Sequence, residues 1–236
     1  MSARQARIRA LIDAIRRFME ARRDTMPGVA MLLRRLAETD MPESGFLDVP
    51  PQGARHDAIL TDAIAGIDAL DLRDIAASLT AAKEDLHWRE DDNRYYPPGA
   101  DLGEGYRRCN LHTLLIGPDA CGWHHPDFRL GVFMLGPHTL YRDHNHDAPE
   151  LYLNLSERSG WRLGCGGWRD YPAASLIWNA AGEAHATRVY DRPFLSIFAW
   201  LENVNSPCAV IPRDDWDEIE RGFADHHHGR VDNAIE

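Results

Sequence analysis

The sequence predicts a mainly β protein, in which a barrel or sandwich of short strands is preceded by an α-helical region. The first ninety or so residues carry apolar side chains at helical spacing. From about residue 92 to about residue 215, short β-prone runs alternate with Gly, Pro, Asn and Asp. The chain has 236 residues and 44% of them are hydrophobic, so it can form a core without disulfide staples.

The N-terminal region is expected to hold four helices, over about 1–24, 28–38, 54–70 and 72–88. In the first, apolar residues from Ile8 to Met19 form one stripe, and arginines occupy the solvated remainder. Such a helix can also lie on a membrane surface, but packing against the rest of the protein is the simpler interpretation. The last two helices are separated by a short break, which predicts a helical hairpin.

Seven candidate strands follow, over 110–117, 128–135, the tract after Tyr141, 161–167, 174–180, 186–190 and 194–202. Strands of this length and spacing are typical of sandwiches and barrels. We therefore expect a helical region over 1–91, a barrel over 92–215 and a charged tail over 216–236. The tail is expected to form a short helix followed by a loose end.

The charge balance bears on the class of partner. The formal net charge is -11, from 37 acidic and 26 basic side chains, which argues against a nucleic-acid or anionic-membrane partner. A small-molecule substrate fits better, and the sequence leaves a homo-oligomer open. No run of eighteen apolar residues is present, so we expect no membrane span and a cytoplasmic location. The four cysteines lack metal-ligand spacing and are expected to be buried, reduced thiols.

The segment YRDHNHDAPELYLNL, from Tyr141 to Leu155, concentrates residue types that bind metals. If its second half is a strand, the leucines fall on one face, and Glu150 and Tyr152 fall on the other. His144 and His146 share the parity of Glu150. Pro149 predicts a bend or a change of strand between the histidine pair and the glutamate.

A second unit, NAAGEAHATRV, places Gly182 and His185 in a turn and strand that a barrel can bring beside the first unit. Imidazoles and a carboxylate together suit one divalent transition metal, with zinc, iron, manganese, cobalt and nickel all compatible. The alternative is that these are ordinary polar residues on a half-exposed strand. The remaining histidines of interest are expected in loops or in the solvated tail: His124, His125, His138, and His226 to His228.

The pattern His-x-His-x3-Glu, followed by Gly-x-x-His, resembles the two motifs of the cupin family. That resemblance implies a double-stranded β-helix, or jelly-roll, barrel with one metal in its mouth. Three positions depart from the family pattern. The glycine after the first motif is displaced to Gly160, Ala180 replaces a proline, and Val189 replaces an asparagine.

A narrower pattern, Tyr141-x4-His146-x3-Glu150-x-Tyr152 with Trp200 downstream, resembles the cupin-type dimethylsulfoniopropionate lyases. These bacterial enzymes split this osmolyte into dimethyl sulfide and acrylate. The resemblance implies that Tyr152 is the catalytic base, and that Tyr141 and Trp200 line the pocket, with Tyr141 a second candidate catalytic residue. It implies four candidate metal ligands: His144, His146, Glu150 and His185.

The chemistry of β-elimination suits these residue types. A divalent ion stabilises charge on the substrate carboxylate, and an adjacent cation favours the phenolate form of Tyr152. Aromatic rings can hold the sulfonium, and Trp200, Tyr141, Trp178 and Tyr190 are the candidates. Two other functions remain open: a cupin isomerase or dioxygenase acting on another small carboxylate, and a non-catalytic metal-binding sensor module.

Overall fold

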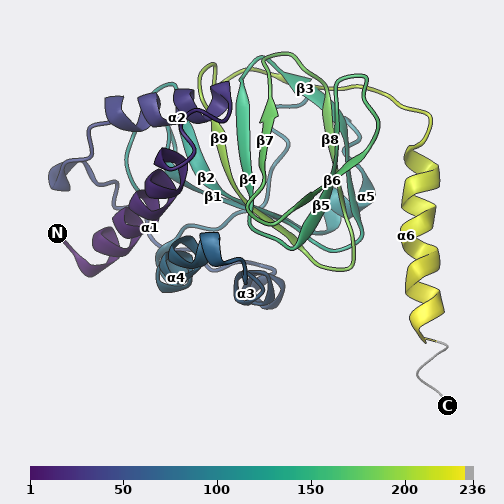
Figure 1. The fold of residues 1–236 in the computed structure, drawn as a ribbon, viewed down its shortest axis with the longest axis horizontal. Helices are drawn as coiled ribbons and strands as arrows, with labels where there is room; N and C mark the ends of the chain where they lie inside the picture. The colour runs from purple at the N-terminus through teal and green to yellow at the C-terminus, as the bar shows by residue number, and fades with distance from the viewer. Residues whose placement is uncertain (232–236) are drawn as a thin grey trace.

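The computed structural model describes the backbone of residues 1–231 and the side chains of residues 1–223. The N-terminal helices lie on one side of a two-sheet β-barrel, and a C-terminal helix lies on the other side (Figure 1). The mainly β fold class, the cupin-type barrel and the N-terminal helical region expected from the sequence are thus confirmed.

Four helices form the N-terminal region: α1 (Ala3–Glu20), α2 (Pro27–Glu38), α3 (Asp57–Ala65) and α4 (Arg73–Ala82). The Ser2 hydroxyl caps α1 by accepting from the backbone N–H of Gln5, and Pro27 opens α2 at a position where its missing N–H is not needed. Helix α4 contacts both α1 and α3. Short 3₁₀ helices cover Glu43–Gly45, Leu70–Leu72 and Lys83–Asp85.

Two five-stranded antiparallel sheets form the barrel within the described residues. The first has the order β1-β2-β9-β4-β7: β1 (Asn110–Ile116), β2 (Arg129–Leu135), β9 (Phe194–Trp200), β4 (Glu150–Asn154) and β7 (Leu176–Asn179). The second has the order β10-β3-β8-β5-β6: β10 (Cys208–Val210), β3 (Thr139–His146), β8 (His185–Val189), β5 (Arg158–Leu163) and β6 (Arg169–Pro172).

The tract after Tyr141 is two strands rather than one. Strand β3 ends at His146 and β4 begins at Glu150 in the other sheet, so the change of strand expected at Pro149 is confirmed. The strands β6 and β10 and the short helix α5 (Glu104–Arg108) were not predicted. Their sequences, RDYP, CAV and EGYRR, are too short to show a period of two or of 3.6.

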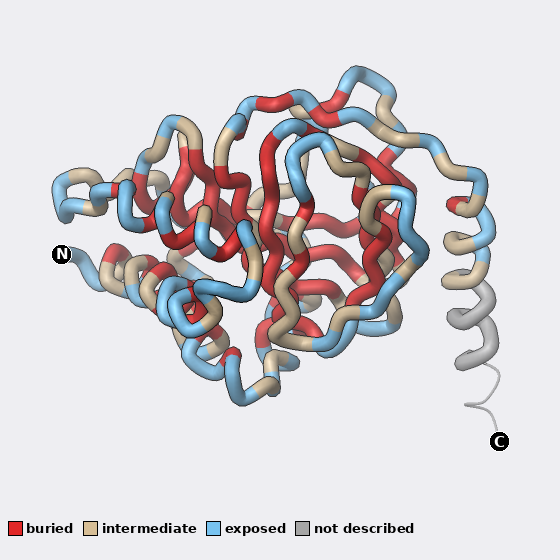
Figure 2. The backbone as a smooth tube through the Cα atoms, turned by 45° about the horizontal axis from the view of Figure 1, so that its top comes forward, coloured by how far each residue is buried: buried red, intermediate tan, exposed pale blue. Residues whose placement is uncertain are grey.

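The N-terminal helices and the first sheet share one core. Leu11 of α1 and Leu32 of α2 belong to the same buried cluster as Leu151 and Leu153 of β4. A second cluster fills the barrel interior and is mainly aromatic, with Phe133 among its members. Figure 2 shows buried residues both in the N-terminal helices and in the strands of the barrel. The outward leucines of β4 therefore hold the helices, and its inward side chains face the barrel interior.

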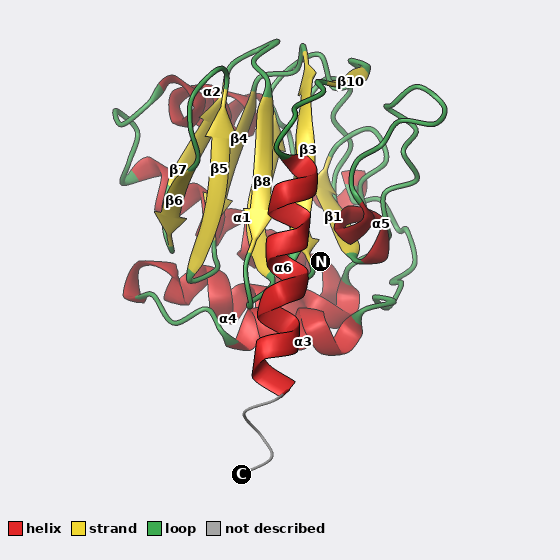
Figure 3. Cartoon of the chain, turned by 90° about the vertical axis from the view of Figure 1, so that its right-hand side faces the viewer, coloured by secondary structure: helices red, strands yellow, loops and turns green. Residues whose placement is uncertain are grey.

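Helix α6 (Trp216–Val231) lies along the outer face of the second sheet (Figure 3). The indole Nε1 of Trp216 donates to Asp143 Oδ2 at 2.8 Å, and Arg162 donates to both oxygens of Asp143. The helix expected in the tail is therefore present, and it contains the backbone of His226 to His228. The expected loose end falls on residues 232–236, which lie outside the described residues. None of the described helices is long and apolar enough to cross a bilayer.

The cysteines follow the expectation with one exception. Cys109, Cys121 and Cys208 are buried and free, as expected from their spacing. Cys165 is also free but is exposed, because it lies in the turn between β5 and β6. The prediction that all four thiols are buried is therefore wrong at this position.

Candidate metal centre and pocket

Three buried histidines converge inside the barrel. His144 and His146 point inward from β3, and the register of β3 with β8 places His185 directly opposite His144. Their candidate ligand atoms all lie within 4.8 Å of one another. The histidine pair shares one parity, and His185 lies beside it on the neighbouring strand, as the sequence predicts.

Backbone carbonyls fix the ring orientation of all three imidazoles. The Nδ1 atom of His144 lies 2.8 Å from Arg142 O, that of His146 lies 2.8 Å from Ala148 O, and that of His185 lies 3.1 Å from Glu183 O. A carbonyl only accepts, so each Nδ1 carries the hydrogen and each Nε2 presents a lone pair. Metal-binding histidines have this arrangement.

The Nε2 atoms are suited to a ligand. Burial and the neighbouring His185 lower the pKa of His144 well below 6.5, so this imidazole is neutral and able to coordinate. The Nε2 atom of His185 is buried, with no hydrogen-bond partner in the described part of the chain. A divalent ion would satisfy it, so the donor set fits a metal.

A glycine turn holds the second motif against the first. Gly182 has φ +74°, a conformation that favours glycine, and its N–H donates to His146 O at 2.8 Å. The Asn145 amide donates to Gly182 O at 3.2 Å. This turn fixes the start of β8, and therefore the position of His185.

Glu150 joins the histidines from the opposite sheet. Its Oε2 lies 3.3 Å from His146 Nε2 and 3.4 Å from His185 Nε2, and Trp200 Nε1 donates to its Oε1 at 2.8 Å. Burial acts to raise the pKa of Glu150, but the close approach of His146 and His185 outweighs it and holds the pKa below its usual value. The carboxylate is therefore ionised and available as a fourth donor.

Tyr152 is the next inward-facing residue of β4 after Glu150, and it is buried. Its ring lies 4.8 Å from Trp161 and beside Phe133 and Phe198. Burial, and then the charge of Glu150, raise the pKa of Tyr152 well above 10. Without a nearby cation this phenol is neutral.

Tyr141 lies against the histidines. Its ring stacks on His144 at 4.1 Å between centroids and on Tyr106 at 4.2 Å. Its Oη lies 2.6 Å from Tyr96 Oη. Trp200 lies 4.4 Å from His146 between ring centroids. Both residues thus border the candidate metal centre, and Trp200 also orients Glu150 through its hydrogen bond.

A cavity of about 90 Å³ opens onto these residues, with room for a few water-sized groups and so for a small molecule. The predicted residues that line it are Tyr141, His144, His146, Glu150, Tyr152 and Trp200. His185 is not in the lining. The lining residues that the sequence did not reveal include Arg89, Arg94, Tyr95, Tyr96, Tyr106, His112, Asp119, Arg129, Phe133 and Phe198. Arg129 and Phe133 of β2 and Phe198 of β9 alternate with outward-facing neighbours, so strand alternation could have identified them as facing the barrel interior. The lining residues in the loop before α5 have no such pattern.

Two predicted substrate-binding residues lie elsewhere. Trp178 pairs in register with the outward-facing Leu151 and packs on α2, where a Cβ on Gly28 would clash with its ring. Tyr190 donates to Asp170, and the Arg158 guanidinium covers its ring at 4.0 Å. Neither residue lines the cavity, because strand alternation turns Trp178 outward and β8 ends before Tyr190. His124, His125 and His138 lie in loops, as the sequence predicts. They do not line the cavity.

A family model described as dimethylsulfoniopropionate lyase matches residues 30–196. The chain belongs to this family. The lyase DddQ of Ruegeria pomeroyi is 28% identical over 76 residues, which are 32% of this chain. The match spans 38% of the length of that relative.

Solved structures of such enzymes share the fold of this family member. A chain from the crystal structures of the DMSP lyases RdDddP and RnDddQII has a TM-score of 0.66 at 20% identity, covering 89% of this chain and 100% of that one. The DMSP lyase DddQ from Ruegeria pomeroyi has a TM-score of 0.61 at 20% identity, covering 85% and 95%. At this identity the likeness concerns the fold.

Proposed function

We propose that the protein cleaves dimethylsulfoniopropionate to dimethyl sulfide and acrylate by β-elimination, with Tyr152 as the base. The observation that carries the proposal is the row of inward side chains on β4. It places a buried phenol two residues after the carboxylate that contacts the histidine triad. Membership of the lyase family and the shared fold support the same substrate.

The elimination requires one proton acceptor and one stabilised leaving group. Tyr152 Oη takes the proton from the carbon next to the carboxylate, the C–H electrons form the new C=C bond, and the C–S bond breaks. The sulfur keeps that electron pair, so dimethyl sulfide leaves neutral and acrylate remains. The aromatic interior around Tyr152 suits the sulfonium, which has no hydrogen-bond donors and interacts with ring faces.

His144, His146, His185 and Glu150 would hold one divalent transition metal. When bound, such an ion acts as a Lewis acid on the substrate carboxylate and favours the phenolate of Tyr152. Because burial and Glu150 raise the pKa of Tyr152, the proposal predicts that the base works only in metal-loaded protein.

The test is headspace gas chromatography of dimethyl sulfide from metal-reconstituted protein and from the Tyr152→Phe variant. Loss of a positioned general base is expected to slow release by roughly 10²- to 10⁴-fold. The matched control is Tyr190→Phe, which also removes one phenol oxygen but outside the cavity, and it should retain the wild-type rate.

Metal content is measured in each sample, so that loss of the ion is not mistaken for loss of the base. Wild-type release from the Tyr152→Phe variant would show that another residue is the base. No release from folded, metal-loaded wild-type protein would overturn dimethylsulfoniopropionate as the substrate.

A further inference from the structure

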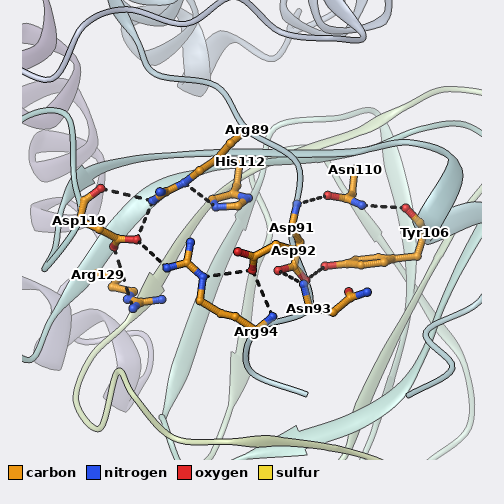
Figure 4. A network of polar contacts seen from close by, with 10 residues as sticks. All are labelled: Arg89, Asp91, Asp92, Asn93, Arg94, Tyr106, Asn110, His112, Asp119 and Arg129. Carbon is orange, nitrogen blue, oxygen red and sulfur yellow. Dashed lines mark hydrogen bonds and ion pairs between the residues drawn. The ribbon is translucent and has the colours of Figure 1, made fainter. Parts of the chain in front are cut away.

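A cluster of three arginines surrounds one carboxylate at the cavity mouth. Figure 4 shows Arg89, Arg94 and Arg129 gathered around Asp119. The Oδ2 atom of Asp119 accepts from Arg89 Nη2 at 2.9 Å and lies 3.4 Å from Arg94 Nη1. All four residues line the cavity.

Two of these arginines already have partners. Arg89 donates from Nε to His112 Nε2 at 3.1 Å and from Nη2 to Asp119. Arg94 donates from Nε to Asp92 Oδ1 at 3.1 Å. Asp91, another carboxylate of the lining, accepts from Tyr106 Oη at 2.7 Å. Asp119 Oδ2 and Asp91 Oδ2 are therefore engaged by other groups, whereas Asp119 Oδ1 has no hydrogen-bond partner within the described residues.

Arg129 differs from both. Its side chain is 9% exposed, and its guanidinium makes no hydrogen bond within the described part of the chain. The nearest carboxylate oxygen, Asp119 Oδ1, is 4.0 Å from its Nη2, which is too long for a hydrogen bond. Its Nε is buried without a partner. A buried guanidinium with unused donors is costly, and a bound anion would satisfy it.

Aromatic rings cover Arg129 without using its donors. Its guanidinium carbon lies 4.8 Å from the Tyr95 ring centroid and 5.8 Å from that of Trp200. Ring contacts of this kind occupy the flat faces of the guanidinium. The N–H groups lie in its plane, in a fork that matches a carboxylate.

The sheet register places Arg129 beside the metal centre. Arg129, Trp200 and Glu150 are direct neighbours across β2, β9 and β4. Two strand spacings, about 10 Å, separate the backbones of Arg129 and Glu150. Tyr152 lies in the adjacent inward row, together with Gly131 and Phe198. A small substrate can therefore contact the arginine and the base at the same time.

We infer that Arg129 binds the carboxylate end of the substrate and so restricts the site to small molecules that carry an anionic group. The inference rests on the proposed function, because it assigns that substrate an orientation. The carboxylate lies between Arg129 and the candidate metal centre, and the sulfonium faces the aromatic interior around Phe133.

The test measures binding of two half-substrates to metal-loaded protein by tryptophan fluorescence. Propionate carries only the anionic end, and trimethylsulfonium carries only the cationic end. In Arg129→Gln, propionate affinity is expected to fall at least tenfold while trimethylsulfonium affinity stays within twofold. Arg129→Lys keeps the charge but loses the fork, so it should lie between wild type and Arg129→Gln. The matched control is Arg158→Gln, on the outside of the barrel, which should bind both probes as wild type does.

Equal weakening of both probes would overturn the inference, because it would mean that Arg129 only packs the aromatic rings. Unchanged propionate binding would also overturn it. Steady-state kinetics separate the inference from the proposed function. A KM for dimethylsulfoniopropionate raised at least tenfold in Arg129→Gln, with a smaller change in kcat, supports both. Arg129-dependent propionate binding by a wild-type protein that releases no dimethyl sulfide supports the anchor and overturns the substrate assignment.

Discussion

Single residues of the candidate metal centre follow from local sequence, because alternation along one strand can be read directly. The parity of Glu150 and Tyr152 on β4, and of His144 and His146 on β3, holds in the structure. Arg129 could not be assigned a role in this way. The role proposed for Arg129 depends on the pairing of β2 with β9, which brings together residues about seventy positions apart.

His112 gives a prediction for stability against pH. It is partly buried and accepts from Arg89 Nε at 3.1 Å. Burial, and then the Arg89 charge, lower its pKa from 6.5 to about 3. Between these values the unfolded chain binds a proton that the folded protein does not, so stability falls as the pH falls. This histidine contributes a loss of about 1.4 kcal/mol per pH unit across that window.

The His112→Gln variant keeps a hydrogen-bond acceptor for Arg89 but removes the imidazole that titrates. Urea unfolding at several pH values between 6.5 and about 3 should show a shallower loss of stability in the variant. Other titrating groups are common to both proteins and cancel in the comparison. Parallel stability curves for the two proteins would mean that His112 titrates normally in the folded state.

At the scale of elements, the sequence located the helices and most strands, but it could not assign every side chain to a face. Trp178 is the example: it lies in a predicted strand, yet it packs on α2 outside the barrel. Which face of β7 is buried by helices depends on tertiary packing that no local pattern shows. The short strands β6 and β10 escaped prediction because each acquires its structure from its partner strand.

The position of Trp178 predicts a separation of stability from substrate binding. Trp178→Ala should lower the free energy of unfolding by about 3 kcal/mol, because it removes packing between β7 and α2. The KM for dimethylsulfoniopropionate should not change. The matched comparison is Trp200→Phe, which removes the hydrogen bond to Glu150 inside the cavity and should impair turnover. Weaker substrate binding by Trp178→Ala at unchanged stability would mean that Trp178 contacts the substrate.

At the scale of the molecule, the candidate metal centre joins the two sheets of the barrel. Its histidines belong to β3 and β8 of the second sheet, and Glu150 belongs to β4 of the first. A bound ion would therefore link layers that must separate when the protein unfolds. Because the unfolded chain has no preformed site, the binding free energy would add to folding stability.

This link predicts that chelation destabilises the whole protein. Metal at a thousandfold excess over its Kd should add about 4 kcal/mol to the free energy of unfolding, and chelator should remove that increment. Calorimetric melting of loaded and chelated protein measures it, with metal content determined in parallel. In His185→Ala, which removes one of the three clustered imidazoles, the two melting curves should nearly coincide. Wild-type curves that coincide despite bound metal would place the ion away from the junction of the sheets.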